Sequence, residues 1–240
     1  MTASTQAQAP TETATATQPP PTPTLTPVPP TATLSPTFTP TPSQTPTSTK
    51  TSTATLTPTY ALLRGQVIPE RANCRYGPGA MYIYKYGLVG GSNLEIIGRN
   101  GLGDWILIQA IGGDNPCWVK AELMDVKGEI ISVEPVDAHI IMPWSPYYGP
   151  LKGVSASREG DVVTVFWGAL TLHAGDDAEQ VPYVIEAWVC QNGEITFNPL
   201  GAYGVAAEVV DEPGCDEASH GRVLAAEKHG YTQPVEIPWP

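Results

Sequence analysis

Residues 94–108 read LEIIGRNGLGDWILI, and this stretch decides the fold class. Residues 94–99 and 105–108 are short runs rich in isoleucine and leucine, of strand length. The five residues between them, 100–104, form a glycine-rich connection of the kind that joins two antiparallel strands. The stretch therefore predicts a β-hairpin, and similar short runs further along the chain predict an all-β protein.

The composition changes sharply at about residue 60. Residues 1–59 are dominated by Thr, Pro, Ala, Ser and Gln, and their only charged side chains are Glu12 and Lys50. So little apolar surface cannot offset chain entropy, and proline favours extended polyproline II, so we expect a disordered stalk. Dense Thr with Pro is also typical of O-glycosylated stalks, and a plain linker is the alternative. About 180 residues follow, enough for two small domains.

The formal net charge of the chain is -12, and it lies in the part after the stalk because Glu12 and Lys50 cancel. Such acidity argues against nucleic acid and anionic lipid surfaces as partners. The sequence contains no run of 18 apolar residues, so it predicts no transmembrane helix. The N-terminus shows no signal peptide pattern, so a cytoplasmic origin is an alternative to the extracellular or cell-surface location that we favour.

The four cysteines favour that location. They fall into two widely spaced pairs, one in each half of the region after the stalk, and none belongs to a CxxC motif: Cys74, Cys117, Cys190 and Cys215. An even number of cysteines in small β-rich units is typical of disulfides in an oxidising compartment. A zinc site built from Cys190, Cys215, His220 and His229 is the alternative, but the spacing matches no zinc finger.

Residues 60–127 resemble the bacterial SH3 (SH3b) domain family in several motifs that occur in the family's order. Residues 72–79, ANCRYGPG, are similar to its N-V-R-x-G-P-G signature. Residues 94–99 and 103–108 resemble its next two strands, the second with the G-x-W-x-x-V pattern, and residues 117–119 resemble its closing G-W-V strand. The resemblance implies a small SH3-like barrel.

Two cysteines depart from this family pattern. Cys74 replaces the usual valine after asparagine, and Cys117 replaces the glycine before tryptophan. Both replacements fall on strands that such a barrel would bring together. The resemblance therefore implies a Cys74–Cys117 disulfide, which would help to hold a small core.

The same resemblance implies a ligand site, because such domains are generally associated with cell-wall peptide or glycan material. We assign to it Arg75, Tyr76, Tyr84, Tyr86 and Trp105. Tyrosine and tryptophan contribute large contact areas at low entropy cost, and arginine suits a ligand carboxylate. The alternative is that these side chains pack within the protein, because tyrosines at positions 82, 84 and 86 would also lie on one face of a strand.

The remaining residues predict a linker and a second β domain. Residues 128–149 are rich in proline and aromatic residues, and residues 150–240 contain several strand-like runs separated by turns, which favours a β-sandwich. Residues 161–167 and 226–234 resemble the second strand and a late loop of fibronectin type III domains. His220 stands where that family has a tyrosine. We interpret Cys190–Cys215 as a local disulfide.

Motifs for catalysis are not found. The sequence contains no GxSxG, HExxH, P-loop or dinucleotide fingerprint. Acidic residues at 176–177 and 211–217 suit a solvated loop better than a calcium site. We therefore expect a non-enzymatic extracytoplasmic binding or display protein without metal or cofactor, whose SH3-like domain contacts peptidoglycan or other envelope components. The alternative is a structural or protein–protein interaction module of the bacterial surface without wall binding.

Overall fold

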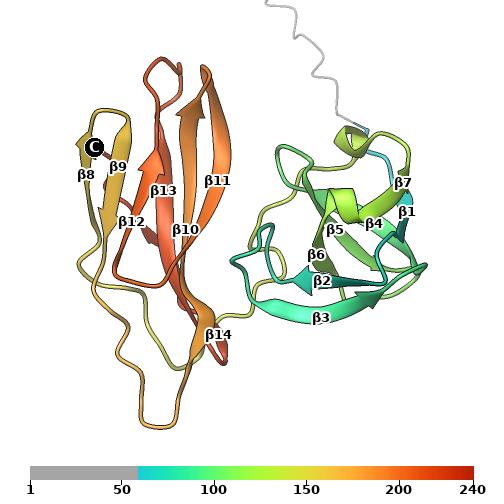
Figure 1. Ribbon diagram of the computed structural model, residues 1–240, viewed down its shortest axis with the longest axis horizontal. Helices are drawn as coiled ribbons and strands as arrows, with labels where there is room; N and C mark the ends of the chain where they lie inside the picture. The colour runs from blue at the N-terminus through green and yellow to red at the C-terminus, as the bar shows by residue number, and fades with distance from the viewer. Residues whose placement is uncertain (1–58) are drawn as a thin grey trace, which may run out of the picture. The chain divides into compact units, whose positions relative to one another are not determined.

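The computed structural model describes residues 59–240, which belong to one compact unit. The stalk prediction for residues 1–59 lies outside the described residues, apart from Thr59. The described part is all-β, as expected: its strands form three antiparallel sheets, with two short 3-10 helices (Figure 1). No helix in this part is long and apolar enough to cross a membrane.

The first sheet has seven strands in the order β3-β2-β6-β5-β4-β1-β7. Its strands are β1 (Leu63–Val67), β2 (Arg71–Arg75), β3 (Tyr84–Val89), β4 (Asn93–Arg99), β5 (Trp105–Ala110), β6 (Cys117–Lys120) and β7 (Met124–Lys127), with helix η1 (Ala121–Leu123) before β7.

This sheet is not closed into a barrel, which differs from the small barrel that the SH3b resemblance implies. The pairing path ends at β3 on one side and at β7 on the other. All four residues of β7 pair with β1, and the pairing of β3 is with β2. The two end strands therefore have no pairing with each other in the described part of the chain.

Strands β4 and β5 form the hairpin that the opening stretch predicts. The Asn100 side chain organises its turn: Nδ2 donates to Asp104 Oδ1 (2.6 Å), and Oδ1 accepts the backbone N–H of Trp105 (3.2 Å). Gly103 has a φ of 75°, in the left-handed region that favours glycine. The turn is thus fixed by the residue types found in it.

The core of the first sheet surrounds a disulfide between Cys74 and Cys117, whose Cα atoms lie 5.6 Å apart. Both cysteines and Trp118 are fully buried. The packed residues come from all seven strands and one loop, and include Val67, Ala72, Leu88, Leu94, Ile96, Ile106, Ile108, Val119, Met124 and Val133. Because this core is small, a covalent link across it contributes a large share of its stability.

Two further sheets follow from residue 155. One has the order β12-β9-β8, with β8 (Ser155–Glu159), β9 (Val162–Phe166) and β12 (Ala206–Val210). The other has the order β11-β10-β13-β14, with β15 paired to β13: β10 (Ala178–Gln191), β11 (Glu194–Ala202), β13 (His220–Glu227), β14 (Gly230–Tyr231) and β15 (Val235–Glu236).

These two sheets share one hydrophobic core. Val163 and Val165 of β9 pack in the same cluster as Ile185 and Ala187 of β10, with Trp167 also buried there. Alternate residues of each strand point to this core, as expected when two sheets pack face to face. The structure also joins Cys190 to Cys215, the second expected disulfide.

The other face of β10 is covered as well. Val184 packs in a separate cluster with Tyr82 and Met142. A Cβ atom on Gly201 of β11 would lie 2.9 Å from Cβ of Met81, closer than such atoms approach in proteins. Strand β10 is therefore covered on both faces, by its own sandwich and by the segment that joins β2 to β3.

Residues 128–149 are an ordered connection in the structure. They contain helix η2 (Ile130–Ser132), and isolated bridges join Pro135 to Arg99 and Trp144 to Tyr231. The Arg99 guanidinium donates to the backbone carbonyls of Val133, Asn100 and Gly101 and is buried. These contacts tie the connection to both neighbouring sheets.

Candidate functional site

Two of the five residues assigned to a ligand site line one groove. Arg75 ends β2 and Tyr84 begins β3, and the two are directly paired. The groove has a volume of about 330 Å³. Its other lining residues are Asn73, Ala80, Met81, Tyr82, Ile83, Glu179, Gln180 and Val181.

Arg75 is the charged group that the groove offers to an anion. Its Nη1 donates to the backbone carbonyl of Tyr82 (2.6 Å). No carboxylate of residues 59–240 lies within 4.0 Å of its guanidinium, whereas Arg64, Arg158 and Arg222 each have at least one. Burial lowers the pKa of Arg75 somewhat, but the group stays cationic at neutral pH. Its remaining donors suit a planar carboxylate.

Glu179, at the start of β10, supplies a negative charge. It lines the same groove as Arg75 and is half-buried. Tyr84 adds an aromatic ring with 52% of its surface exposed. A cation, a carboxylate and a tyrosine in one groove can bind a zwitterionic chain such as a peptide, which carries both charges.

The other two tyrosines lie around Lys85 instead. Its Nζ is 5.1 Å from the ring centroid of Tyr76 and 5.9 Å from that of Tyr86, and it donates to the carbonyl of Pro116 (2.7 Å). Tyr86 donates to the carbonyl of Asn115 (2.7 Å), and burial raises its pKa. These side chains hold the loop before β6.

Trp105 lies apart from both groups. It is the first residue of β5, pairs with Lys120 of β6 and is half-buried. It is not among the residues that line the groove. The five assigned residues are thus divided among three places.

Residues 179–181 were not recognised from the sequence as part of this groove. They are about a hundred positions from Arg75, and nothing in their local pattern indicates a site. The sequence predicts that Tyr82 shares one strand face with residues 84 and 86. In the structure it precedes β3 and is 1% exposed, so positions 82, 84 and 86 do not form one exposed face.

Beneath the groove, a buried carboxylate joins three elements. Glu186 of β10 is fully buried; Tyr82 donates its hydroxyl to Oε1 (2.5 Å), and Arg222 of β13 donates Nε to Oε2 (2.5 Å). His139 Nε2 lies 2.7 Å from Oε2.

Burial alone raises the pKa of Glu186, but the hydrogen bond and charge of His139, with Arg222 and Tyr82, outweigh burial and hold the pKa below its usual value. Burial and the Glu186 charge raise the pKa of Tyr82, so its hydroxyl stays protonated and donates. This network fixes the position of the segment that carries the groove wall.

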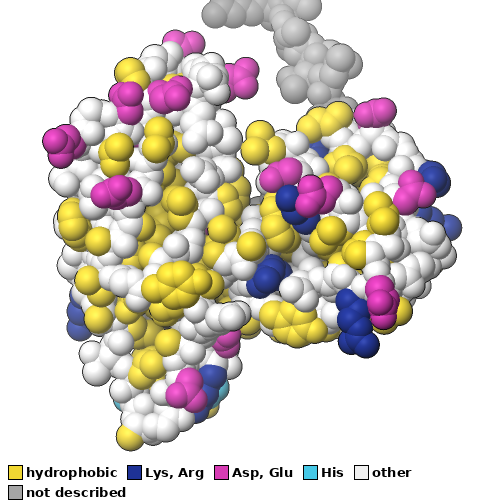
Figure 2. Space-filling view, viewed as in Figure 1, with side chains coloured by type: hydrophobic (Ala, Val, Ile, Leu, Met, Phe, Trp, Pro, Cys, Tyr) yellow, Lys and Arg dark blue, Asp and Glu magenta, His cyan; other side chains and the backbone are white. Residues whose placement is uncertain are grey.

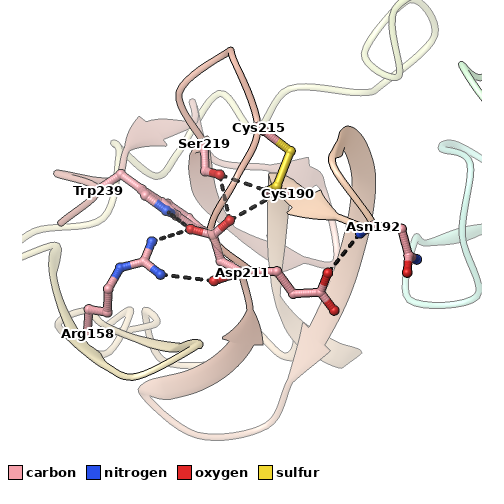
Figure 3. Close-up of a disulfide and its surroundings, with 8 residues drawn as sticks. Arg158, Cys190, Asn192, Asp211, Cys215, Ser219 and Trp239 are labelled. Atoms are coloured by element: carbon pink, nitrogen blue, oxygen red, sulfur yellow. Dashed lines mark hydrogen bonds and ion pairs between the residues drawn. A yellow bond between two sulfur atoms is a disulfide. The ribbon is translucent and has the colours of Figure 1, made fainter.

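A second buried carboxylate, Asp211, organises the surroundings of the Cys190–Cys215 disulfide (Figure 3). Its Oδ1 accepts the backbone N–H of Cys190 (2.9 Å), and its Oδ2 accepts Nε1 of Trp239 (2.9 Å). Arg158 forms an ion pair with the same carboxylate. Asp211 is therefore fully engaged by protein groups.

The alternative zinc interpretation fails on these contacts. Both of its cysteines are in the disulfide, His220 stacks on Trp188, and His229 binds Glu227 through Nδ1 (2.8 Å). Within residues 59–240, no group of three or more His, Cys, Asp and Glu residues is arranged to hold a metal ion. The two disulfides indicate an environment outside the cytoplasm.

No protein-family model and no curated protein matches the sequence. Among solved structures, the chain is similar to one titled "Titin kinase and its flanking domains", with 20% identity, a TM-score of 0.30 and coverage of 38% of this chain and 16% of that one. It is also similar to a DUF3823 family protein from Bacteroides ovatus, with 14% identity, a TM-score of 0.27 and coverage of 72% and 91%.

Proposed function

We propose that this chain is a non-catalytic extracytoplasmic binding protein, and that the groove at Arg75 and Tyr84 holds peptide carboxylates of cell-wall material. The observation that carries the proposal is the arginine itself. Arg75 lines a groove and lacks a carboxylate partner among the described residues. An arginine with free donors beside an exposed tyrosine is suited to bidentate carboxylate recognition.

Two other features support this proposal. The motifs of residues 60–127 resemble SH3b domains, a family generally associated with cell-wall peptides, and those of residues 150–240 resemble fibronectin type III domains, which would serve as spacer. On the face that Figure 2 shows, Lys and Arg side chains are scattered rather than gathered into one basic patch. That distribution disfavours a polyanion as partner and favours a small ligand that needs one cation.

The test is retention on purified peptidoglycan sacculi. Arg75→Gln removes the cation, and Arg71→Gln is its matched control, because Arg71 lies on the same strand, is exposed and does not line the groove. A hydrogen bond to a charged group contributes about 1.5–3 kcal/mol, so we expect retention of the Arg75 variant to weaken about tenfold or more. Equal retention of both variants would contradict the proposal.

The second candidate is a display or protein–protein interaction module without wall binding. The buried Glu186 network favours it, because it joins the two halves of the described unit into one scaffold without need of a ligand. Retention on surface proteins, with none on sacculi for the unmodified chain, would support this candidate and exclude the first.

A further inference from the structure

A second cleft lies on the outer face of the five-stranded sheet, away from Arg75. Its volume is about 410 Å³, within the range of small-molecule sites. Four separate parts of the chain line it: Pro78 between β2 and β3, the β4–β5 turn, the connection at residues 136–138, and strands β10 and β11. None of its residues was assigned to a site from the sequence.

One wall of the cleft is aromatic. Trp188 of β10 and Phe197 of β11 are directly paired across the sheet, with ring centroids 4.9 Å apart and planes tilted by 43°. His220 of β13 stacks on Trp188 at 5.0 Å, nearly parallel. Trp188 and Phe197 are both partly exposed. Two tilted rings held by strand pairing form a preset apolar surface on which a rigid ring can lie.

The charges around the cleft offset one another. The Arg222 guanidinium lies 5.2 Å from the Trp188 ring, its Nε binds Glu186, and its Nη2 is 3.9 Å from Asp137 Oδ1. No lysine or arginine lines the cleft. The Asp137 carboxylate would repel an anion, and the neighbouring Arg222 would repel a cation. This arrangement favours an uncharged ligand.

Polar groups at the rim can still direct such a ligand. The Asp137 carboxylate is 64% exposed, and Oδ1 already accepts the backbone N–H of His139, which leaves Oδ2 as an acceptor. The Thr196 hydroxyl is not one of these groups, because Thr196 pairs with Val189 of the sandwich core and its side chain points to the face opposite to Trp188 and Phe197. The Asn100 amide is held by Asp104 and Trp105, and these two bonds leave one of its two Nδ2 hydrogens unused.

We infer that this cleft binds an uncharged saccharide. One apolar face of the sugar ring lies against Trp188 and Phe197, and its hydroxyl groups donate to Asp137. An aromatic platform with a carboxylate acceptor at its rim matches the two kinds of surface of a sugar, an apolar C–H face and polar hydroxyl edges. This inference is independent of the peptide groove proposed above.

The experiment is calorimetric titration of the full chain with four uncharged trisaccharides: chitotriose, cellotriose, maltotriose and mannotriose. We expect saturable binding of at least one. Phe197→Ala should weaken that binding about tenfold or more, whereas Phe166→Ala, on an exposed position of β9 outside the cleft, should leave it unchanged. No binding of any of the four, or equal binding by both variants, would overturn the inference.

A second variant protects the test against misfolding. Asp137→Asn keeps Oδ1 as the acceptor of the His139 backbone N–H and replaces the Oδ2 acceptor by an amide nitrogen, so we expect about three- to tenfold weaker binding with an unchanged melting temperature. Arg75→Gln should leave saccharide binding intact. The saccharide inference and the peptide proposal are therefore tested by different variants, so the failure of one can be told from the failure of the other. Unaltered affinity of the Asp137 variant would remove Asp137 from the site and contradict the binding mode.

Discussion

Removing the hydroxyl of Tyr82 should destabilise the protein strongly for so small a change. Tyr82→Phe keeps the ring and its edge contact with Tyr231 but leaves Glu186 Oε1, fully buried, without its donor at 2.5 Å. A hydrogen bond to a buried charged group is worth about 1.5–3 kcal/mol. For a chain of this size, such a loss lowers the melting temperature by roughly 4–10 °C.

The assay is thermal and urea unfolding followed by circular dichroism. Tyr84→Phe is the matched control, because Tyr84 is a neighbouring tyrosine that is half exposed, and its free energy of unfolding should change by less than about 0.5 kcal/mol. Equal small effects in the two variants would refute the claim that Glu186 joins the two halves of the unit. A double-mutant cycle with Glu186→Gln should show coupling of about 1 kcal/mol or more.

Three further predictions concern stability. Replacing Cys190 and Cys215 together by alanine opens a loop of 25 residues and should cost about 3 kcal/mol in urea unfolding; an unchanged midpoint would contradict a formed disulfide. Gly201→Ala should lower the melting temperature, and Gly204→Ala, whose Cβ meets nothing within 4 Å, should not; the reverse order would contradict the close packing at β11. Because the pKa of Glu186 is lowered in the folded state, its contribution to stability is present above about pH 4.3 and is lost as pH falls through the folded pKa. Glu186→Gln should therefore flatten the loss of stability between pH 6 and pH 3, and an unaltered slope would contradict this assignment.

The features that depend on local sequence pattern could be predicted from the sequence. The 94–108 hairpin follows from two short runs rich in isoleucine and leucine and a glycine-rich turn, and the structure has it as β4 and β5. The even number and spacing of the cysteines, with the family resemblance, indicated both disulfides. Each of these features is decided by residues close in sequence, or by a covalent rule that needs no geometry.

Contacts between residues distant in sequence could not be predicted from such local patterns. Whether β3 and β7 pair to close the sheet depends on strand ends that are distant in sequence, and the structure leaves the sheet open. The contribution of residues 179–181 to the Arg75 groove depends on how the start of β10 packs. One signal was present: Glu186 is the only charged residue in the apolar run 183–189, and a lone carboxylate in a buried strand requires buried partners.

The central claim is that Arg75 recognises a ligand carboxylate, and one titration tests it directly. A synthetic cell-wall stem peptide is titrated in two forms, with a free C-terminal carboxylate and with a C-terminal amide. We expect the free acid to bind about tenfold more tightly or better, and Arg75→Gln to abolish that difference while Arg71→Gln preserves it. Equal affinities for the acid and the amide, or an undiminished preference in the Arg75 variant, would contradict the claim.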